Sequence, residues 1–251
     1  MAARPFRFGA LGAFVMCAAL LSACASGPSG GATPAAAESA APAPMITELK
    51  PADAIRPGQQ FLVRKTLRGV ALQPFVSQDR AYESVRKQAA KAGSNEIVIT
   101  WAGKREEDNG GIGGVYFVVE AVAVQWTAFT ADIAMGILGS LEERHPLEVE
   151  SMLANIKASR DPVYGTYLLA ALKMSPATKY LPGLVEAYAA IGGASGIPEL
   201  TKLLRYHGSE AVRIEAGRQL VLLGQRSEVD SAAAVDRSPR VQSALRQALL
   251  R

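Results

Sequence analysis

Side chains suited to acid–base, nucleophilic or metal chemistry are scarce in this chain. The sequence holds two histidines, His145 and His207, and two cysteines, Cys17 and Cys24. A metal site would need further ligands converging on the histidines, and no His-x-x-x-His spacing supplies them. His145 precedes a proline and His207 precedes a glycine, so each suits a cationic or hydrogen-bonding residue at a helix C-terminus. Few groups are therefore left to exchange protons near neutral pH.

Other motifs that often carry chemistry have plainer interpretations here. The glycine run at 110–114 precedes a predicted strand and lacks the Gly-Lys-Ser/Thr ending of a phosphate-binding loop, so it indicates a hairpin tip. Ser140 and Ser195 lie outside the Gly-x-Ser-x-Gly pattern of a nucleophile elbow. The paired acids Glu142 and Glu143 fall at an exposed helix end. We expect no catalytic, cofactor-binding or metal-binding residue in this chain, and no enzyme.

One residue has a defined chemical fate, the cysteine at position 24. Two arginines precede an apolar run from Phe8 to Leu21, which has secretory length and is too short to span a bilayer as a mature helix. The run ends in Leu21-Ser22-Ala23-Cys24. This ending resembles the lipobox of bacterial lipoproteins. The resemblance implies a signal peptide over residues 1–23, cleavage before Cys24 and acylation of the Cys24 thiol.

The residues after the cysteine indicate where such an anchor would hold the protein. In lipoproteins an aspartate directly after the cysteine favours retention in the inner membrane, whereas here Ala25 and Ser26 follow. The resemblance therefore implies the periplasmic face of the outer membrane. Residues 25–44 are small residues and proline apart from Glu38. Such a tract cannot bury apolar surface, and we expect a disordered tether over residues 24–45.

Composition narrows the classes of partner. Removal of the signal peptide deletes Arg4 and Arg7, which lowers the formal charge from +4 to +2. This near balance argues against a protein that binds nucleic acid or another polyanion. Cys24 becomes the sole cysteine, so neither a disulfide framework nor a cysteine metal site is expected.

Residues 46–127 have the pattern of a small α/β domain. A strand-like run extends from Phe61 to Leu72, and a helix is predicted from Ser77, as N-cap, to a stop at Gly93. A strand follows at 97–101, then a polar and glycine-rich stretch, then a long strand at 115–126. Alternate residues of the long strand form two sets, or parities, that face opposite sides of the sheet. One parity is apolar and the other carries Glu120, which predicts a half-buried strand packed on the helix. The predicted apolar stripe of the helix is Ala81, Val85 and Ala89.

The order strand, helix, strand, hairpin and strand has a known relative. The segments 89–98, AAKAGSNEIV, and 120–124, EAVAV, resemble the small α/β lobe of the YbjQ-like families. The same lobe occurs in the outer-membrane sensor lipoprotein of the Rcs envelope-stress phosphorelay. Gly93 and Asn95 fit the helix-to-strand turn of that family. This chain lacks the cysteines that cross-link the sensor's lobe. The resemblance therefore supports a shared fold but not a shared sensing mechanism.

After Trp126 the hydrophobic period changes from two to 3.6, which predicts an all-α domain over residues 128–251. Turn signals divide it into short helices, and the segments 196–204 and 208–224 resemble the two helices of a HEAT repeat. Weaker matches to the same pattern occur at 159–171 and 238–245, at unequal distances from this unit. A helical bundle without repeats therefore remains the alternative fold. In the repeat we place Val212 and Leu220 on the buried inner face. Arg213, one position along, is predicted to be exposed and nearly neutral for stability. The turn signals are His145-Pro146, Asp161-Pro162, Ser175-Pro176, Gly192-Gly193, Gly208-Ser209 and Ser238-Pro239.

These features predict an α+β protein, with a small α/β lobe followed by a HEAT-like helical array. Because helical arrays present extended binding surfaces, we expect a protein-binding scaffold or accessory factor in an envelope assembly. It would be anchored to the membrane through acylated Cys24, with a periplasmic or outer-membrane protein partner and no small-molecule substrate. The alternative is an envelope-stress sensor that signals through its α/β lobe, and a cell-envelope enzyme is third.

Replacing Cys24 with serine tests the lipid anchor. The hydroxyl cannot accept the diacylglycerol, so Cys24→Ser should remain an uncleaved precursor that takes up no labelled palmitate in growing cells. A variant that still incorporates label and still fractionates with the outer membrane would contradict the assignment.

Overall fold

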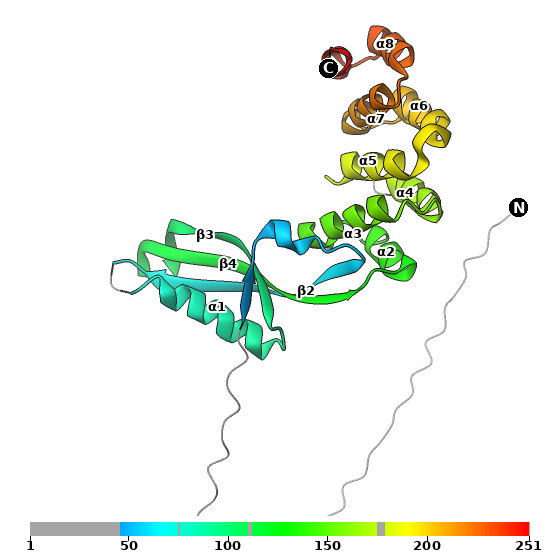
Figure 1. Ribbon diagram of the computed structural model, residues 1–251. Helices are drawn as coiled ribbons and strands as arrows, with labels where there is room; N and C mark the ends of the chain where they lie inside the picture. The colour runs from blue at the N-terminus through cyan, green and yellow to red at the C-terminus, as the bar shows by residue number, and fades with distance from the viewer. Residues whose placement is uncertain (1–45, 75, 110–111, 175–178, 251) are drawn as a thin grey trace, which may run out of the picture. The chain divides into compact units, whose positions relative to one another are not determined.

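The computed structural model describes residues 46–74, 76–109, 112–174 and 179–250. The signal peptide, the tether, Cys24, Gly110-Gly111 and Ser175-Pro176 lie outside these ranges. A four-stranded mixed sheet with one covering helix is followed by a series of helices (Figure 1). The α+β class is therefore confirmed, as an α/β lobe followed by an all-α array. We call residues 46–128 the sheet lobe and helices α2–α9 the helical array; both belong to one compact unit.

The sheet has the strand order β1-β3-β4-β2. Strand β2 (Gln59–Leu72), strand β3 (Glu96–Asn109) and strand β4 (Ile112–Ala128) form the antiparallel part. The predicted hairpin thus has longer arms than expected, because its polar residues up to Asn109 belong to β3. Strand β1 (Thr47–Leu49), which pairs in parallel with the start of β3, was not anticipated.

Helix α1 (Asp79–Lys91) covers one face of the sheet as its sequence predicted. Its buried residues are Ala81, Val85 and Ala89, and they pack on the apolar parity of β4. The N-cap is Gln78, one residue after the predicted Ser77, whose hydroxyl accepts a hydrogen bond from the amide of Asp79. It ends before Gly93, whose φ of +70° is the left-handed conformation that favours glycine.

The other parity of β4 is more buried than a half-exposed strand would be. Val122 and Val124 pack with Phe61 and Val98 and with Leu147 from the helical array. Glu120 lies further along this face, where it forms an ion pair with Arg105. The helical array therefore covers part of the face that the alternation pattern left to solvent.

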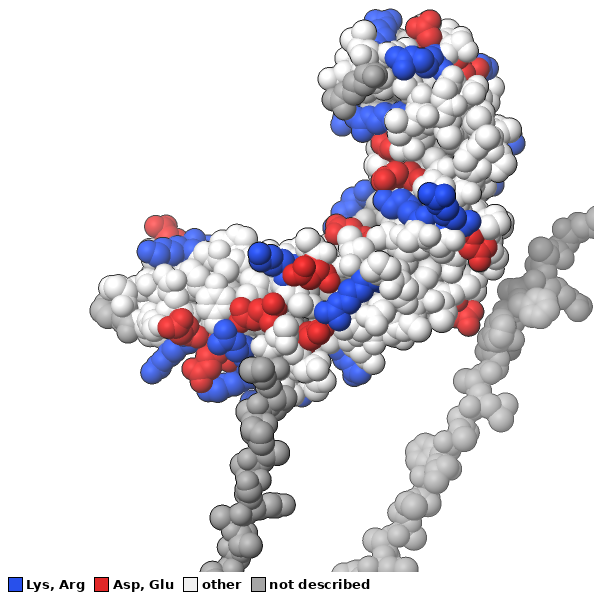
Figure 2. Space-filling view, in the orientation of Figure 1, with Lys and Arg blue, Asp and Glu red and all other residues white. Residues whose placement is uncertain are grey.

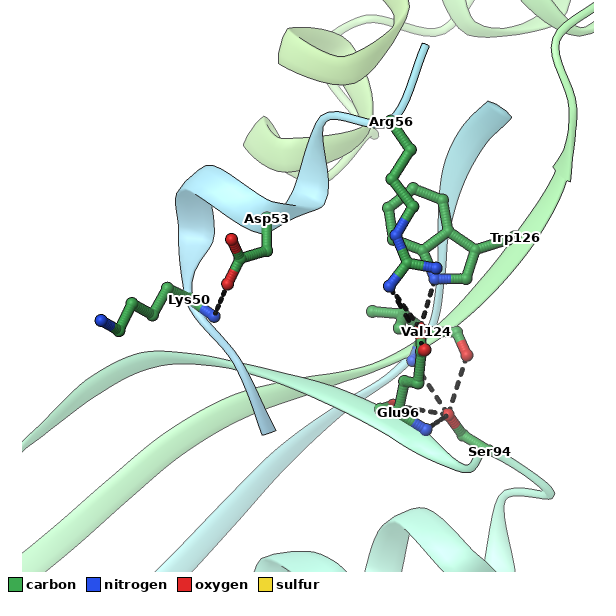
Figure 3. Close-up of polar contacts among 7 residues, drawn as sticks. All are labelled: Lys50, Asp53, Arg56, Ser94, Glu96, Val124 and Trp126. Carbon is green, nitrogen blue, oxygen red and sulfur yellow. Dashed lines mark hydrogen bonds and ion pairs between the residues drawn. The ribbon is translucent and has the colours of Figure 1, made fainter. Parts of the chain in front are cut away.

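A polar cluster ties the segment before β2 to the sheet (Figure 3). The guanidinium of Arg56 lies 3.9 Å from the centre of the Trp126 ring, and its Nη2 is 3.3 Å from both carboxylate oxygens of Glu96. The Trp126 indole N–H also donates to Glu96. Beneath it, the buried Ser94 hydroxyl lies 2.8 Å from the carbonyl oxygen of Val124. These contacts join the start of β3, the end of β4 and the entry to β2.

The helices after β4 pack as successive pairs. Contacts join α2 with α3, α4 with α5, α6 with α7, and α8 with α9. Helices α3, α5, α7 and α9 also contact one another in that order, which builds one continuous layer, while α2, α4, α6 and α8 lie in the other. The bounds are α2 Ala131–Leu138, α3 Pro146–Ser159, α4 Val163–Met174, α5 Leu181–Gly192, α6 Ile197–Tyr206, α7 Glu210–Leu222, α8 Arg226–Val235 and α9 Pro239–Leu249.

Helix α3 covers the first part of the outer edge of β2, up to Val63, with hydrogen-bonding side chains. Asn155 accepts from the amide of Gly58 and donates to the carbonyl of Gln59, each at 2.9 Å. The Ser151 hydroxyl accepts from the amide of Phe61 at 3.3 Å. These two residues and Glu148 are spaced by three and four, so they lie along one face of the helix.

Glu148 completes this edge contact. Its carboxylate accepts from the amide of Val63 at 2.5 Å, and its backbone carbonyl accepts from the buried side-chain amide of Gln60 at 2.9 Å. The other hydrogen-bonding atom of that amide, Oε1 of Gln60, is buried without a partner. The sheet lobe and the helical array are thus joined by specific polar contacts as well as by apolar packing.

Removing the Asn155 side chain tests this junction. Asn155→Ala leaves the Gly58 amide and the Gln59 carbonyl without their partners, and each unsatisfied group of this kind costs about 1–3 kcal/mol. With two such groups, we expect urea denaturation to show a loss of about 2–6 kcal/mol in the free energy of unfolding. Glu150→Ala, on the exposed side of the same helix, should change it by less than about 0.5 kcal/mol. Equal losses in the two variants would mean that the edge contact contributes nothing.

Candidate protein-binding groove

Turns within the helix pairs share one hydrogen-bonding scheme. Nδ1 of His207 accepts from the amide of Ser209 at 3.1 Å, and a carboxylate oxygen of Asp236 accepts from the amide of Ser238 at 2.8 Å. In each turn the acceptor directly follows the first helix of the pair, and a serine stands two positions later. The pairs α6–α7 and α8–α9 therefore share the hydrogen bonding of their turns as well as the order of their helices.

Arg213 departs from its predicted place. Its side chain is 3% exposed and its guanidinium bonds to both carboxylate oxygens of Asp236, at 2.8 and 3.1 Å. It also donates to the carbonyls of His207 and Gly208. The prediction that Arg213 is exposed is thus wrong, whereas Val212 and Leu220 are buried as expected.

Opposing effects act on the carboxyl of Asp236. Burial raises its pKa, but the hydrogen bonds from Arg213 and the Ser238 amide, with the Arg213 charge, outweigh burial and hold the pKa below its ordinary value. Because the folded pKa lies below that of the unfolded chain, the stabilisation is complete above the unfolded pKa. It is lost as the pH falls through the folded value.

A groove of about 690 Å³ lies on the layer that contains α5, α7 and α9. Val221 and Leu222 from α7 and Ala244 and Ala248 from α9 supply its apolar surface. Leu222 is 78% exposed, so its side chain remains available to a partner. The remaining lining residues are Glu186, Glu215, Arg218, Gln219, Arg226 and Gln247.

The charged side chains of the groove are engaged with one another or with nearby groups. Arg218 lies 3.4 Å from Glu215, and Glu186 lies 3.0 Å from Lys157 of α3. Arg226 donates to the carbonyl of Leu249. Basic and acidic residues are also interspersed over the face of the array drawn in Figure 2. The groove therefore offers an apolar strip with a mixed-charge border, which suits the apolar face of an amphipathic helix.

Both histidines occupy helix ends, as expected, but His145 lies at the opposite end from the one predicted. His145 is the N-cap of α3 and not a C-cap: its Nδ1 accepts from the Leu147 amide at 3.3 Å. Burial lowers the pKa of His145, against the charge of Glu148, which raises it. The contribution of this neutral cap is therefore present above the unfolded pKa and lost as the pH falls through the folded one. His207 follows α6 at the predicted C-cap position.

The remaining residues considered for chemistry do not come together. Ser140 donates to the carbonyl of Gly136 and Ser195 to that of Gly192, so both bond within their own turns. Glu142 and Glu143 are exposed. Among the described residues, no group of three or more His, Cys, Asp or Glu is placed to hold a metal ion. No helix in the described ranges is both long and apolar enough to cross a membrane.

Comparison with known proteins gives no family for this chain: no family model, no curated protein and no solved structure matches it. The groove and its geometry are therefore the basis for assigning a function. The sequence pattern did not single out Leu222 or Ala248, because helical periodicity alone does not distinguish an exposed apolar helix end from a buried one.

The buried ion pair gives a sharp test of the observed helix register. Arg213→Ala leaves Asp236 buried without its counter-charge, and breaking a buried pair in this way costs about 3–5 kcal/mol. Arg218→Ala, further along the same helix and 56% exposed, should stay within about 0.5 kcal/mol of the parent. Chemical denaturation at neutral pH measures both, and similar small losses would show that Arg213 faces solvent.

Proposed function

We propose that this chain is a protein-binding scaffold or accessory factor, held at the periplasmic face of the outer membrane by an acylated Cys24. The groove on α5, α7 and α9 is the observation that carries the binding role. Its apolar strip is open to solvent beside paired charges, which is the arrangement expected of a partner-binding surface with a polar border.

The layer beneath the groove supports a binding surface that keeps its shape. Leu220, Ala216 and Leu245 are buried under it, and Arg213 and Asp236 link the two helix pairs through their buried ion pair. A preformed surface loses less conformational entropy on binding than one that must first fold. The stacking of α5, α7 and α9 therefore favours recognition of a helix laid across their exposed sides.

The anchor and the tether supply the cellular context of this proposal. The lipobox resemblance implies acylation, and residues 25–44 have the composition expected of a tether. A scaffold on such a tether would search for its partner close to the membrane surface. Tethering of this kind raises the effective concentration of a weakly binding surface.

Photocrosslinking in living cells tests the binding role. A photoreactive residue at Leu222 of the lipidated protein should give a predominant covalent product with one protein. The same residue at Val163, which is exposed at the start of α4 in the other layer, should not. Ala248→Glu places a charge on the apolar strip and should abolish the Leu222 product without lowering the melting temperature.

Two outcomes would contradict the proposal. Equal products from positions 222 and 163 would mean that the groove has no special role. Products mainly from Ile112, which is exposed near the end of the β3–β4 hairpin, with position 222 silent, would favour the stress-sensor alternative acting through the sheet lobe.

A further inference from the structure

A second pocket lies on the helical array, away from the groove. It has a volume of about 630 Å³ and is formed by the ends of α6 and α8 with the turns that follow them. We call it the turn pocket. Its lining residues are Leu204, Arg205, Tyr206, His207, Arg213, Ser231, Ala232, Val235, Asp236 and Arg237.

Two large apolar side chains stand exposed at this pocket in equivalent places. Tyr206 is the last residue of α6 and is 78% exposed, and Val235 is the last residue of α8 and is 81% exposed. Each directly precedes the acceptor residue of its turn, His207 or Asp236. Met174, the last residue of α4, is 66% exposed. Repetition at one structural position is what an extended binding edge requires, whereas scattered exposed side chains need no explanation.

The charges of the turn pocket do not balance as those of the groove do. The acid in its lining, Asp236, already accepts hydrogen bonds from Arg213 and the Ser238 amide. Arg213 is buried and fully occupied by Asp236 and two carbonyls. The charges that face solvent are therefore those of Arg205, which bonds to Glu228 of α8, and Arg237.

We propose that the turn pocket binds a short acidic segment of a partner protein. An apolar side chain of that segment packs against the exposed Tyr206 and Val235, and a neighbouring carboxylate bonds to Arg237, while Arg205 lines the same pocket. Arginine binds carboxylates through paired N–H donors, and tyrosine and arginine are the residues that most often dominate binding energy at interfaces. This surface is separate from the groove and goes beyond the scaffold role proposed for it.

A phospholipid headgroup would also offer negative charge, but the pocket fits a peptide better. Recognition of anionic membranes through electrostatics uses clusters of about four to eight basic residues. Two solvent-facing arginines line this pocket, and one of them is paired with Glu228. The pocket also presents the exposed apolar side chains of Tyr206 and Val235, which a charged headgroup would leave unused.

Selection from a random library of displayed peptides tests the proposal on the purified full-length chain. The enriched sequences should carry an apolar residue flanked by aspartate or glutamate. When synthesised, these peptides should bind saturably. Arg237→Glu and Tyr206→Ser should each weaken binding by at least about tenfold, the scale of a single interface hot spot. Arg80→Glu, an equal charge change at an exposed residue of α1, is the matched control and should leave the affinity unchanged.

The remaining outcomes overturn the proposal. Enrichment of basic peptides, enrichment of no motif, or equal binding to Arg237→Glu would each do so. Binding of phosphatidylglycerol vesicles that Arg237→Glu abolishes, without peptide binding, would assign the pocket to the membrane. Ala248→Glu should leave peptide binding intact, so a failure of the groove can be told from a failure of the turn pocket.

Discussion

Backbone amides and carbonyls that leave water must find hydrogen-bonding partners, and at the outer edge of β2 the partners are side chains of α3. Asn155, Ser151 and Glu148 replace the neighbouring strand that this edge would otherwise seek. The edge at residues 58–63 is thereby covered, and the first long helix of the array is held in register with the sheet. Everything after α3 is stacked on a helix whose place is set by these bonds.

The stacked helix pairs that follow share one type of turn. Each turn within the pairs α6–α7 and α8–α9 uses a side-chain acceptor to bind the amide two residues ahead. Successive pairs are linked by the buried contact of Arg213 with Asp236, whose charges are satisfied by each other and by backbone groups. Because these polar contacts are buried, a shift of one helix by a single residue would leave them unpaired, which specifies the stacking more tightly than apolar packing does.

Local signals in the sequence were sufficient for much of the fold. The stripe Ala81, Val85 and Ala89 and the stop at Gly93 predict α1 correctly, and each predicted turn signal within the described residues falls at a helix boundary. These features depend on near neighbours in the chain. Strand β1 escaped prediction because it is very short and its partner, the start of β3, lies beyond both β2 and α1 in the chain. Arg213 was misplaced because its counter-charge, Asp236, lies in the following helix pair. The groove was not predictable as a site, since it exists only where α7 and α9 meet.

Gln242 occupies the position in α9 that Arg213 occupies in α7, and its side-chain amide donates to the backbone carbonyl of Asp236 at 2.7 Å. Arg213 makes the corresponding bond to the carbonyl of His207 and also requires an acid from the next pair. A helix pair with glutamine at this position keeps the bond to its turn. It needs no acid from a neighbouring pair, because the glutamine side chain carries no charge. The same helix position therefore stabilises its turn in both pairs, with a charged bond between pairs where it is arginine and without one where it is glutamine.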